Sequence, residues 1–284
     1  MDKKFQCGRF EFSLNRPIVM GIINVTPDSF SDGGAYSSID AAIEHAYKMI
    51  DDGVDILDIG GESSRPGSDR VSTSEELKRL LPLIESLKDC GVPLSVDTYK
   101  PDVMKSVIDM NVDMINDICG FTLPGSLETV SSSNCGLCVM YMNGDINNMH
   151  NCFPDMNVVR EANIFFTKQL NRLLKYNSNI KDRIVLDPGL GFGKTIEQNY
   201  YLINQLEKLK VFSCPLMIGA SRKSMIGKLV DRSVSERLCA SVSCALISVM
   251  YGANIVRVHD VAETVDSLKI LNAIKQGSYT HEAG

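Results

Sequence analysis

Carboxylate and amide side chains follow several short apolar runs of the sequence. Asp97, Asn116 and Asp187 each end such a run; Met140 lies within another run, and Phe192 lies in the loop that follows Asp187. Carboxylate oxygens accept hydrogen bonds, and an Asn side chain both accepts and donates them. Together these side chains would suit a planar heterocycle edged with N–H and C=O groups.

Basic residues at other run ends suit a different ligand. Arg257 and His259 lie two positions apart near the end of one predicted strand, so their side chains point the same way. Such a pair would bind a multiply charged anion. Asn24 cannot hold a metal ion alone, but Mg²⁺ binds through few protein ligands when substrate phosphates supply the rest.

A third cluster, residues 221–224 (Ser-Arg-Lys-Ser), precedes an apolar helical pattern. Backbone N–H groups at the start of a helix, together with the Ser224 hydroxyl, would hold a carboxylate or a phosphate. Lys223 has a second interpretation, as the Schiff-base lysine of a barrel aldolase.

Eight apolar runs alternate with amphipathic helical patterns and would position these side chains. The runs cover residues 18–23, 54–59, 93–97, 112–116, 137–142, 183–187, 215–219 and 254–258. Eight parallel strands close a (β/α)8 TIM barrel, whose active site lies at the carboxyl ends of the strands. We therefore predict a single-domain α/β barrel over residues 1–284. The alternative is a doubly wound open sheet, but it places its ligand at one switch point, whereas polar residues here follow nearly every run.

Other signals mark the ends and starts of elements. Residues 5–14 alternate about a glycine, which predicts a β-hairpin within residues 1–16 that could cover the bottom of the barrel. Residues 277–284 are expected to form a flexible tail. Capping signals predict helix starts at Ser37, Thr73, Thr195 and Ser233.

The composition is that of a globular protein. Of 284 residues, 44% are hydrophobic and 23% are charged, with a formal net charge of −6. This balance gives no support to nucleic-acid binding, which needs a basic face. The longest apolar-looking run, residues 238–251, contains three serines and is too short to span a bilayer. Because the N-terminus also lacks a secretory pattern, we expect a cytoplasmic protein without a membrane partner.

The nine cysteines lie within predicted strands and helices, as expected of reduced, buried thiols. Cys135 and Cys138 have the spacing of a redox or zinc motif. No second cysteine pair and no histidine pair lies near them in the sequence, so we interpret them as the start of a buried strand.

Several of the polar residues also have structural interpretations. A strand-end Asp97 or Asn116 can simply cap a helix, and Asp55 and Asp58, inside a predicted strand, are interpreted as structural. The glycines of residues 189–193 lack the full spacing of a dinucleotide fingerprint and predict a flexible loop.

With these residues in view, the sequence resembles the dihydropteroate synthase family over nearly its whole length. The resemblance rests on seven motifs in order: GIINVTPDSFSDGG (21–34), GGESSRPG (60–67), SVDT (95–98), IND (115–117), DPGLGFGK (187–194), SRKS (221–224) and RVHD (257–260).

The resemblance implies a pterin-binding TIM barrel that joins 6-hydroxymethyl-7,8-dihydropterin diphosphate to p-aminobenzoate, releasing dihydropteroate and diphosphate with Mg²⁺. By motif, the pterin site would comprise Asp97, Asn116, Met140, Asp187, Lys223 and Arg257. The diphosphate site would comprise Asn24, Arg257 and His259, with Asn24 also binding the metal. The p-aminobenzoate site would comprise Ser64, Arg65, Pro66, Phe192, Lys223 and Ser224.

The same resemblance implies a chemistry in which the diphosphate leaves first. Loss of diphosphate leaves a cationic methylene conjugated to the pterin, which negative Asp97 and Asp187 would stabilise more than the ground state. Arg257 and His259 would stabilise the departing charge, with Lys223 completing the catalytic set. The aniline nitrogen then attacks, so no protein nucleophile is needed.

Three positions depart from the common family pattern. Ser64 stands where Thr is usual, Tyr99 replaces a small residue, and Tyr141 replaces a common His. These changes bear on p-aminobenzoate and sulfonamide affinity rather than on the pterin. The Gly, Pro and Ser content of residues 24–36 and 60–72 suggests lids that close over substrate, and the family suggests a homodimer.

Two other functions stay open at this point. A pterin carrier or methyl-group-binding barrel would share the pterin acids, but it would not need the Arg257 and His259 pair or residues 221–224. A Schiff-base aldolase predicts that borohydride traps a substrate on Lys223.

Overall fold

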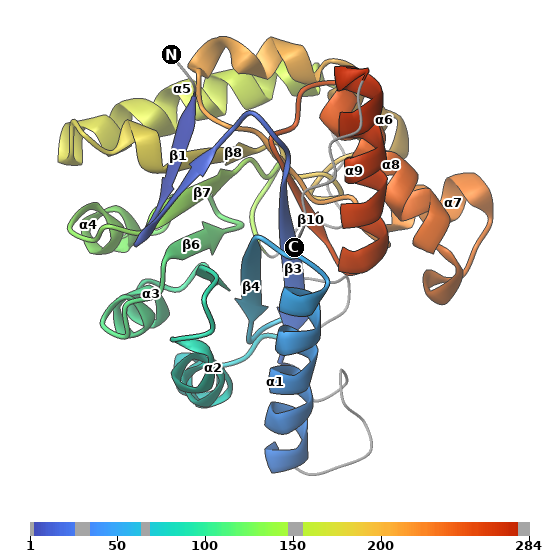
Figure 1. The fold of residues 1–284 in the computed structure, drawn as a ribbon. Coiled ribbons are helices and arrows are strands. Elements are labelled where there is room, and N and C mark those ends of the chain that lie inside the picture. The colour runs from blue at the N-terminus through green and yellow to red at the C-terminus, as the bar shows by residue number, and fades with distance from the viewer. Residues whose placement is uncertain (1–2, 26–34, 64–68, 147–155, 278–284) are drawn as a thin grey trace.

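The computed structural model describes residues 3–25, 35–63, 69–146 and 156–277. Eight parallel strands form its centre, in the spatial order β8-β7-β6-β5-β4-β3-β10-β9 (Figure 1). They are β3 (Ile18–Asn24), β4 (Ile56–Gly60), β5 (Leu94–Asp97), β6 (Met114–Asp117), β7 (Gly136–Met140), β8 (Ile184–Asp187), β9 (Met217–Ile218) and β10 (Ile255–Val258). A parallel bridge between Leu186 and Leu216 joins the two ends of this order. The predicted barrel is therefore confirmed, and the open doubly wound sheet is wrong.

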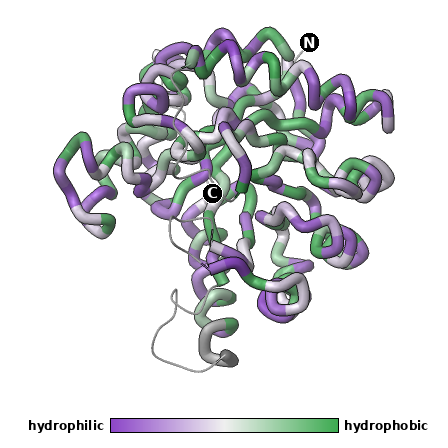
Figure 2. The backbone as a smooth tube through the Cα atoms, turned by 180° about the vertical axis from the view of Figure 1, so that it is seen from behind, coloured by the Kyte–Doolittle hydropathy of each residue, from purple (hydrophilic) through white to green (hydrophobic). Residues whose placement is uncertain are grey.

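Helices surround the strands and connect them. They are α1 (Ala35–Asp51), α2 (Thr73–Leu87), α3 (Pro101–Ile108), α4 (Ser126–Ser131), α5 (Val158–Tyr176), α6 (Ile196–Asn204), α7 (Ser224–Val230), α8 (Leu238–Met250) and α9 (Val261–Gln276), with 3₁₀ segments at Lys181–Arg183, Leu206–Phe212 and Val234–Glu236. Figure 2 shows hydrophobic residues concentrated in the central strands and both kinds of residue along the outer helices. This pattern is what amphipathic helices packed on a buried barrel require.

Alternation along the strands separates two cores. In β4, Leu57 and Ile59 belong to the outer core between strands and helices, whereas Ile56 belongs to the core inside the barrel. The inner core consists of Phe5, Cys7, Ile18, Met20, Ile56, Met114, Cys138, Val185, Met217 and Ile255. Because side chains repeat every second residue, positions two or four residues further along each strand also face the barrel axis.

An N-terminal hairpin closes the barrel at the amino ends of the strands. β1 (Lys4–Cys7) and β2 (Phe10–Ser13) pair antiparallel, and Phe5 and Cys7 are fully buried in the inner core. Arg9 anchors the hairpin by an ion pair to Asp113, 2.9 Å long, just before β6. The prediction that this hairpin covers the barrel bottom is confirmed.

The capping signals were only partly correct. The Thr195 capping box is confirmed at the start of α6. The cap of α2 is Ser72 rather than Thr73, because the Ser72 hydroxyl accepts the Glu75 N–H at 3.2 Å. α1 begins at Ala35, two residues before Ser37. The Ser233 capping box caps a 3₁₀ turn, and α8 begins only at Leu238.

Other sequence interpretations can be placed as well. Cys138 is buried in β7 and Cys135 is buried just before it, as expected for the start of a strand. Within the described ranges, no helix is both long enough and apolar enough to cross a membrane. The expected tail lies outside the described residues from 278 onward, and so do residues 26–34 and 64–68 of the two proposed lids.

Candidate active site

The inward positions at the carboxyl ends of the strands carry polar side chains. Asn24, Asp58, Asp97, Asn116, Asp187 and Arg257 all follow the inward alternation set by the inner core. Gly60 pairs with Asn24 on one side and with Asp97 on the other. A methyl group on Gly60 would lie 3.6 Å from the Asn24 Oδ1 and 3.7 Å from the Asp97 Cβ, so the two side chains flank this glycine.

Arg257 lies between two carboxylates. Its Nε is 2.6 Å from the Asp58 Oδ2, and its Nη2 is 2.7 Å from the Asp97 Oδ2. Asn116 donates from its Nδ2 to the same Asp58 oxygen at 3.1 Å. Four strands, β10, β4, β5 and β6, thus contribute one connected cluster, as the sequence predicts for Asp97, Asn116 and Arg257.

The charge balance of this cluster shifts the pKa of Asp97. One guanidinium between two buried carboxylates leaves one negative charge in excess. Burial raises the pKa of Asp97 to about 7; Arg257 opposes this rise and the neighbouring Asp58 adds to it. For Arg257, burial acts to lower the pKa, but Asp58 and Asp97 outweigh it and the pKa is raised.

The interpretation of Asp58 as a purely structural residue is wrong. Its carboxylate contacts Arg257 and Asn116, two of the predicted pterin residues, so it belongs to the site. The signal was available, because Asp58 lies two positions after Ile56 on the same face of β4. Its Oδ1 is buried and has no hydrogen-bond partner among the described residues.

Lys223 and Asp187 lie on another side of the barrel mouth, which is the opening at the carboxyl ends of the strands. The Lys223 Nζ donates to the Leu190 carbonyl and lies 4.7 Å from the centre of the Phe192 ring. Burial lowers the pKa of Lys223 to about 8, and Asp187 opposes this shift. The Asp187 Oδ1 accepts the Gly189 N–H at 2.7 Å, and burial raises the pKa of this acid against the effect of Lys223.

An apolar wall adjoins these charges. Met140 and Phe192 are buried in one small cluster with Ile118 and Cys119, and Met142 packs against it. Such a wall is suited to the faces of a flat ring whose edges meet the acids.

His259 is held by the segment that precedes α7. The Ser221 Oγ lies 3.0 Å from the His259 Nδ1 and accepts the His259 backbone N–H at 3.2 Å. Arg222 forms an ion pair with Asp260, which joins the same two segments. Ser224 is the first residue of α7, and its side chain is exposed.

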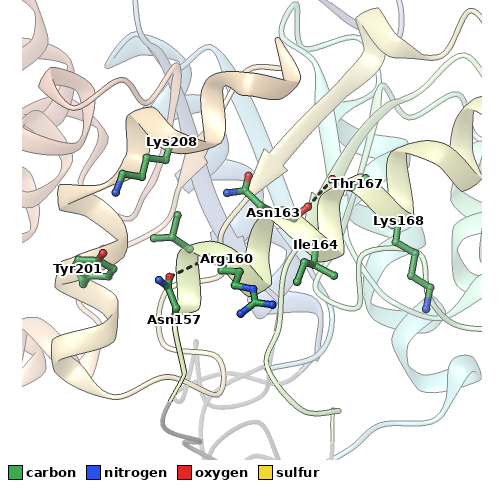
Figure 3. A pocket seen from close by; sticks show the side chains of 9 residues that line it. Asn157, Arg160, Asn163, Ile164, Thr167, Lys168, Tyr201 and Lys208 are labelled. Carbon is green, nitrogen blue, oxygen red and sulfur yellow. Dashed lines mark hydrogen bonds between the residues drawn. The ribbon is translucent and has the colours of Figure 1, made fainter.

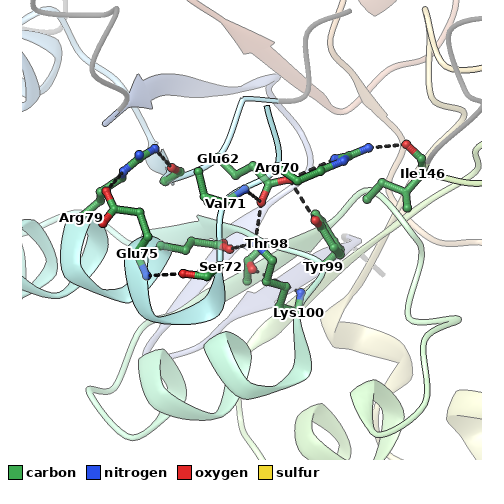
Figure 4. Close-up of polar contacts among 12 residues, drawn as sticks. Glu62, Arg70, Val71, Ser72, Glu75, Arg79, Thr98, Tyr99, Lys100 and Ile146 are labelled. Carbon is green, nitrogen blue, oxygen red and sulfur yellow. Dashed lines mark hydrogen bonds and ion pairs between the residues drawn. The ribbon is translucent and has the colours of Figure 1, made fainter. Parts of the chain in front are cut away.

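Three residues of the predicted p-aminobenzoate site, Ser64, Arg65 and Pro66, lie outside the described residues. The described residues on both sides of them meet at Glu62 (Figure 4). The Glu62 carboxylate accepts hydrogen bonds from Arg70 at 3.0 Å and from the Val71 N–H at 3.3 Å.

The next strand end supports this carboxylate. Tyr99, one of the departures from the family pattern, donates its hydroxyl to Glu62 at 2.9 Å, and Lys100 pairs with both Glu62 and Glu76. Arg70 also donates to the carbonyl of Ile146, after β7. Glu62 could not be predicted from the sequence, because a lone carboxylate in a motif gives no sign of what it contacts.

A separate pocket lies on the outer surface of the barrel, and none of the predicted site residues line it. It is a groove of about 590 Å³ between α5, α6 and the segment Leu206–Phe212, on the outside of the barrel (Figure 3). Arg160, Lys168, Tyr201 and Lys208 are among its lining residues. Since ligands of such barrels bind at the carboxyl ends of the strands, the mouth and not this groove is the candidate active site.

The fold and the mouth together define a class of protein. Acids and an amide face an apolar wall, and cations lie beside them at the same end of a closed barrel. Residues 20–259 match the sequence model of a family described as pterin binding enzyme. The fold and site are therefore those of a pterin-binding barrel enzyme.

Individual relatives narrow this class. The dihydropteroate synthase of Escherichia coli K12 is 44% identical over 261 residues, which cover 92% of each chain. The crystal structure of Burkholderia cenocepacia dihydropteroate synthase complexed with 7,8-dihydropteroate matches with a TM-score of 0.88 and 42% identity, over 97% of this chain and 98% of the other. That of the Xanthomonas albilineans enzyme with 4-aminobenzoic acid matches with a TM-score of 0.90 and 38% identity, over 97% and 99%. This chain belongs to the dihydropteroate synthase family.

Proposed function

We propose that this chain joins 6-hydroxymethyl-7,8-dihydropterin diphosphate to p-aminobenzoate, producing 7,8-dihydropteroate and diphosphate. The observation that carries the proposal is Arg257, which lies between Asp58 and Asp97 at the junction of the acidic and cationic parts of the mouth. A substrate with a hydrogen-bonding ring and a diphosphate needs both parts within the length of one small molecule.

The ring is proposed to bind against the acids. Asp97, Asn116 and Asp187 provide acceptors and one amide for the pterin edge, and Met140 contacts a ring face. Lys223 lies within the same pocket and provides a donor. This assignment follows the family motifs residue by residue, and the inward alternation of the strands supports it.

The diphosphate is proposed to bind at Asn24, Arg257 and His259. No group of three or more His, Cys, Asp or Glu side chains among the described residues could hold a metal ion by itself. The Asn24 side chain supplies one carbonyl oxygen beside Asp97, which suits Mg²⁺ only when phosphate oxygens complete its shell. When bound, Mg²⁺ would neutralise charge on the leaving diphosphate.

The chemistry then requires little of the protein beyond charge and position. Departure of diphosphate leaves positive charge on the methylene and the pterin, which Asp97 and Asp187 stabilise. Arg257 and His259 hold the negative charge that leaves. The aniline nitrogen of p-aminobenzoate attacks from the side of Phe192 and Lys223, and Ser64, Arg65, Pro66 and Ser224 would bind its carboxylate end.

The reaction is tested by steady-state diphosphate release. We expect sustained release only when both substrates are present, with one dihydropteroate formed per diphosphate. Pterin binding without turnover would instead favour a carrier. Trapping of a substrate on Lys223 by borohydride would favour the aldolase.

We further propose a homodimer formed through the face of α7, α8 and α9, which lie together in Figure 1. α8 has no charged residue, yet its Ile247 and Met250 are 47% and 62% exposed. Leu229 of α7 and Ile270 and Ile274 of α9 are also exposed. Exposed apolar side chains on three helices that lie together suit a second copy of the chain.

The dimer is tested by sedimentation of the Met250→Asp variant. We expect the wild type to sediment as a dimer and this variant as a monomer. The control is Ile164→Asp on α5, which changes another exposed apolar residue, 51% exposed, away from this face. A monomeric wild type would contradict the proposal.

A cytoplasmic location is proposed on the cysteines. All eight cysteines in the described part of the chain are free thiols, as in a reducing compartment.

A further inference from the structure

Lys194 is a buried lysine that the proposed reaction does not use. It lies after β8 in the loop of residues 188–194 and is 3% exposed. Its Nζ donates to three backbone carbonyls, those of Gly189 and Phe192 at 2.9 Å and that of Tyr141 at 3.3 Å. An ammonium group has three N–H donors, so these carbonyls use all of them.

An aromatic ring completes the surroundings of this ammonium. The Lys194 Nζ lies 4.4 Å from the centre of the Tyr141 ring. Tyr141 is itself buried and packs against Phe165 and Phe166, with ring centres 5.5 and 6.5 Å away. A cation over an aromatic face in a desolvated site is stabilised electrostatically. Tyr141 therefore shields the cation from water and also contributes to its binding.

Burial of the Lys194 ammonium costs free energy of desolvation, which its contacts must offset. Burial lowers the pKa of Lys194 to about 7, and Asp187 opposes this shift. The carbonyls of Gly189, Phe192 and Tyr141 point toward one position, where their dipoles would repel each other without a cation. Lys194 thus stabilises a backbone arrangement that these carbonyls would not adopt alone.

The loop of residues 188–194 is rich in glycine and packs closely against the backbone that follows β7, so its conformation depends on stabilising contacts. A Cβ on Gly189 would lie 2.0 Å from the Tyr141 carbonyl oxygen, and one on Gly193 would lie 2.0 Å from that of Asn143. Both glycines have positive φ. These glycines permit the close approach, but their conformational freedom makes the loop costly to order.

This loop carries or contacts three groups of the proposed site. Asp187, the last residue of β8, directly precedes the loop and accepts the Gly189 N–H; Phe192 lies within the loop, and the Leu190 carbonyl accepts from Lys223. A change in the course of the loop would therefore move Asp187, Phe192 and Lys223 relative to one another.

We propose that Lys194 is a positioning residue for the pterin side of the site. Its ammonium, enclosed by three carbonyls and the face of Tyr141, fixes the loop that sets Asp187, Phe192 and Lys223. This inference rests on the proposed function, but the cage of carbonyls can be tested separately from the reaction.

The cage is tested by amide hydrogen exchange of the peptide covering residues 186–195, without ligand. We expect Lys194→Met to speed exchange in this peptide at least fivefold and to leave the hairpin and α3 unchanged. The control, Lys168→Met, removes an exposed lysine of α5 and should exchange like the wild type. Lys194→Arg, which keeps the cation, should restore part of the protection.

The positioning role is tested by calorimetric titration with 6-hydroxymethyl-7,8-dihydropterin diphosphate. We expect Lys194→Met to weaken binding about tenfold, with the same fraction of active sites as the wild type. Tyr141→Leu removes the ring face and should weaken binding about threefold, whereas Tyr141→Phe keeps the face and should bind normally. A structural defect alone would lower the fraction of active sites without changing the Kd.

The outcomes distinguish the role of Lys194 from the proposed reaction of the whole chain. Wild-type exchange and wild-type Kd in Lys194→Met would overturn the role of Lys194. If Lys194→Met does not fold, equal Kd values for Tyr141→Leu and Tyr141→Phe would overturn the proposal, because they would show that the ring face over the Lys194 ammonium does not affect binding. If the wild type fails to bind the pterin diphosphate, the proposed function fails, while faster exchange in Lys194→Met would still support the cage.

Discussion

At the scale of single residues, the site depends on one cation shared by two acids. Arg257 contacts both Asp58 and Asp97, and Asn116 contacts Asp58 as well. Removing one carboxylate therefore changes the position and charge of residues that would meet the pterin directly. Asp58 acts through Arg257 and Asn116, which makes it a positioning residue.

Asp58→Asn should weaken pterin diphosphate binding about tenfold, or ~1.4 kcal/mol, because Arg257 loses one of its two ionic partners. Titration calorimetry measures the change. Asp55→Asn is the matched control just before the start of β4, where Asp55 accepts the Val19 N–H and pairs with Arg16. We expect it to lower stability without changing the Kd, and equal Kd changes in the two variants would contradict the role of Asp58.

The raised pKa of Asp97 predicts how stability depends on pH. The folded state keeps a proton on Asp97 up to about pH 7, whereas the unfolded state releases it near 3.8. The folded state therefore binds more protons between these values, and its stability falls as pH rises from 4 to 7.

Asp97→Asn removes this titration. Between pH 4 and 7, its free energy of unfolding should therefore fall by about 3 kcal/mol less than that of the wild type. Urea unfolding at several pH values measures the free energy of unfolding of both proteins. Burial also raises the pKa of Asp117 to about 7 and the charge of Asp97 adds to this rise, so the comparison measures the titration of Asp97 together with its effect on Asp117. A difference that stays constant over this range would contradict the account.

At the scale of elements, loops after different strands hold one another in place. Glu62 after β4 contacts Tyr99 and Lys100 after β5, and Arg70 reaches the Ile146 carbonyl after β7. Glu62 also joins the two sides of residues 63–69 through Arg70 and Val71. The Glu62 carboxylate therefore links the described residues on the two sides of residues 64–68.

Glu62→Gln should raise the KM for p-aminobenzoate about fivefold and leave the Kd of the pterin diphosphate unchanged. The reason is that a neutral amide cannot hold Arg70 and Lys100 as an ion pair does. Steady-state kinetics with each substrate varied in turn distinguishes the two effects. Glu75→Gln, which breaks a partly exposed pair with Arg79 on α2, should change neither value. A larger change for the pterin than for p-aminobenzoate would contradict this role.

The sequence predicted the elements better than the contacts between them. Apolar runs identified all eight barrel strands, because a strand buried on both faces must be apolar throughout. The strand-end residues Asp97, Asn116 and Arg257 were found because chain position alone places them in the mouth. The contacts of Glu62 with Tyr99 and Lys100, and of Lys194 with Tyr141, were not predicted, since these partners follow other strands and lie far away in the chain. The caps at Ser37 and Thr73 were misplaced because several hydroxyl and acidic residues compete at those helix starts.

At the scale of the whole molecule, the two ends of the barrel have separate roles. The amino ends are closed by the hairpin, with Phe5 fully buried in the inner core, and the carboxyl ends carry the site. Stability and ligand binding should therefore respond to different substitutions.

Phe5→Ala should lower the free energy of unfolding by about 3 kcal/mol, because it leaves a cavity inside the barrel. Its KM values should match those of the wild type, since the change lies at the end away from the site. Phe10→Ala in β2, which removes a half-buried ring, should cost less. Urea unfolding and steady-state kinetics measure these effects. A changed KM in Phe5→Ala would show that the two ends are coupled.

The central claim is that acids and cations in one barrel mouth bind different halves of one substrate. The most direct measurement is the calorimetric affinity of Asp187→Asn and His259→Ala for two probes, 6-hydroxymethyl-7,8-dihydropterin and diphosphate with Mg²⁺. We predict a crossed result, in which Asp187→Asn loses at least tenfold affinity for the pterin only and His259→Ala loses it for diphosphate only. Equal losses for both probes in both variants would contradict the claim.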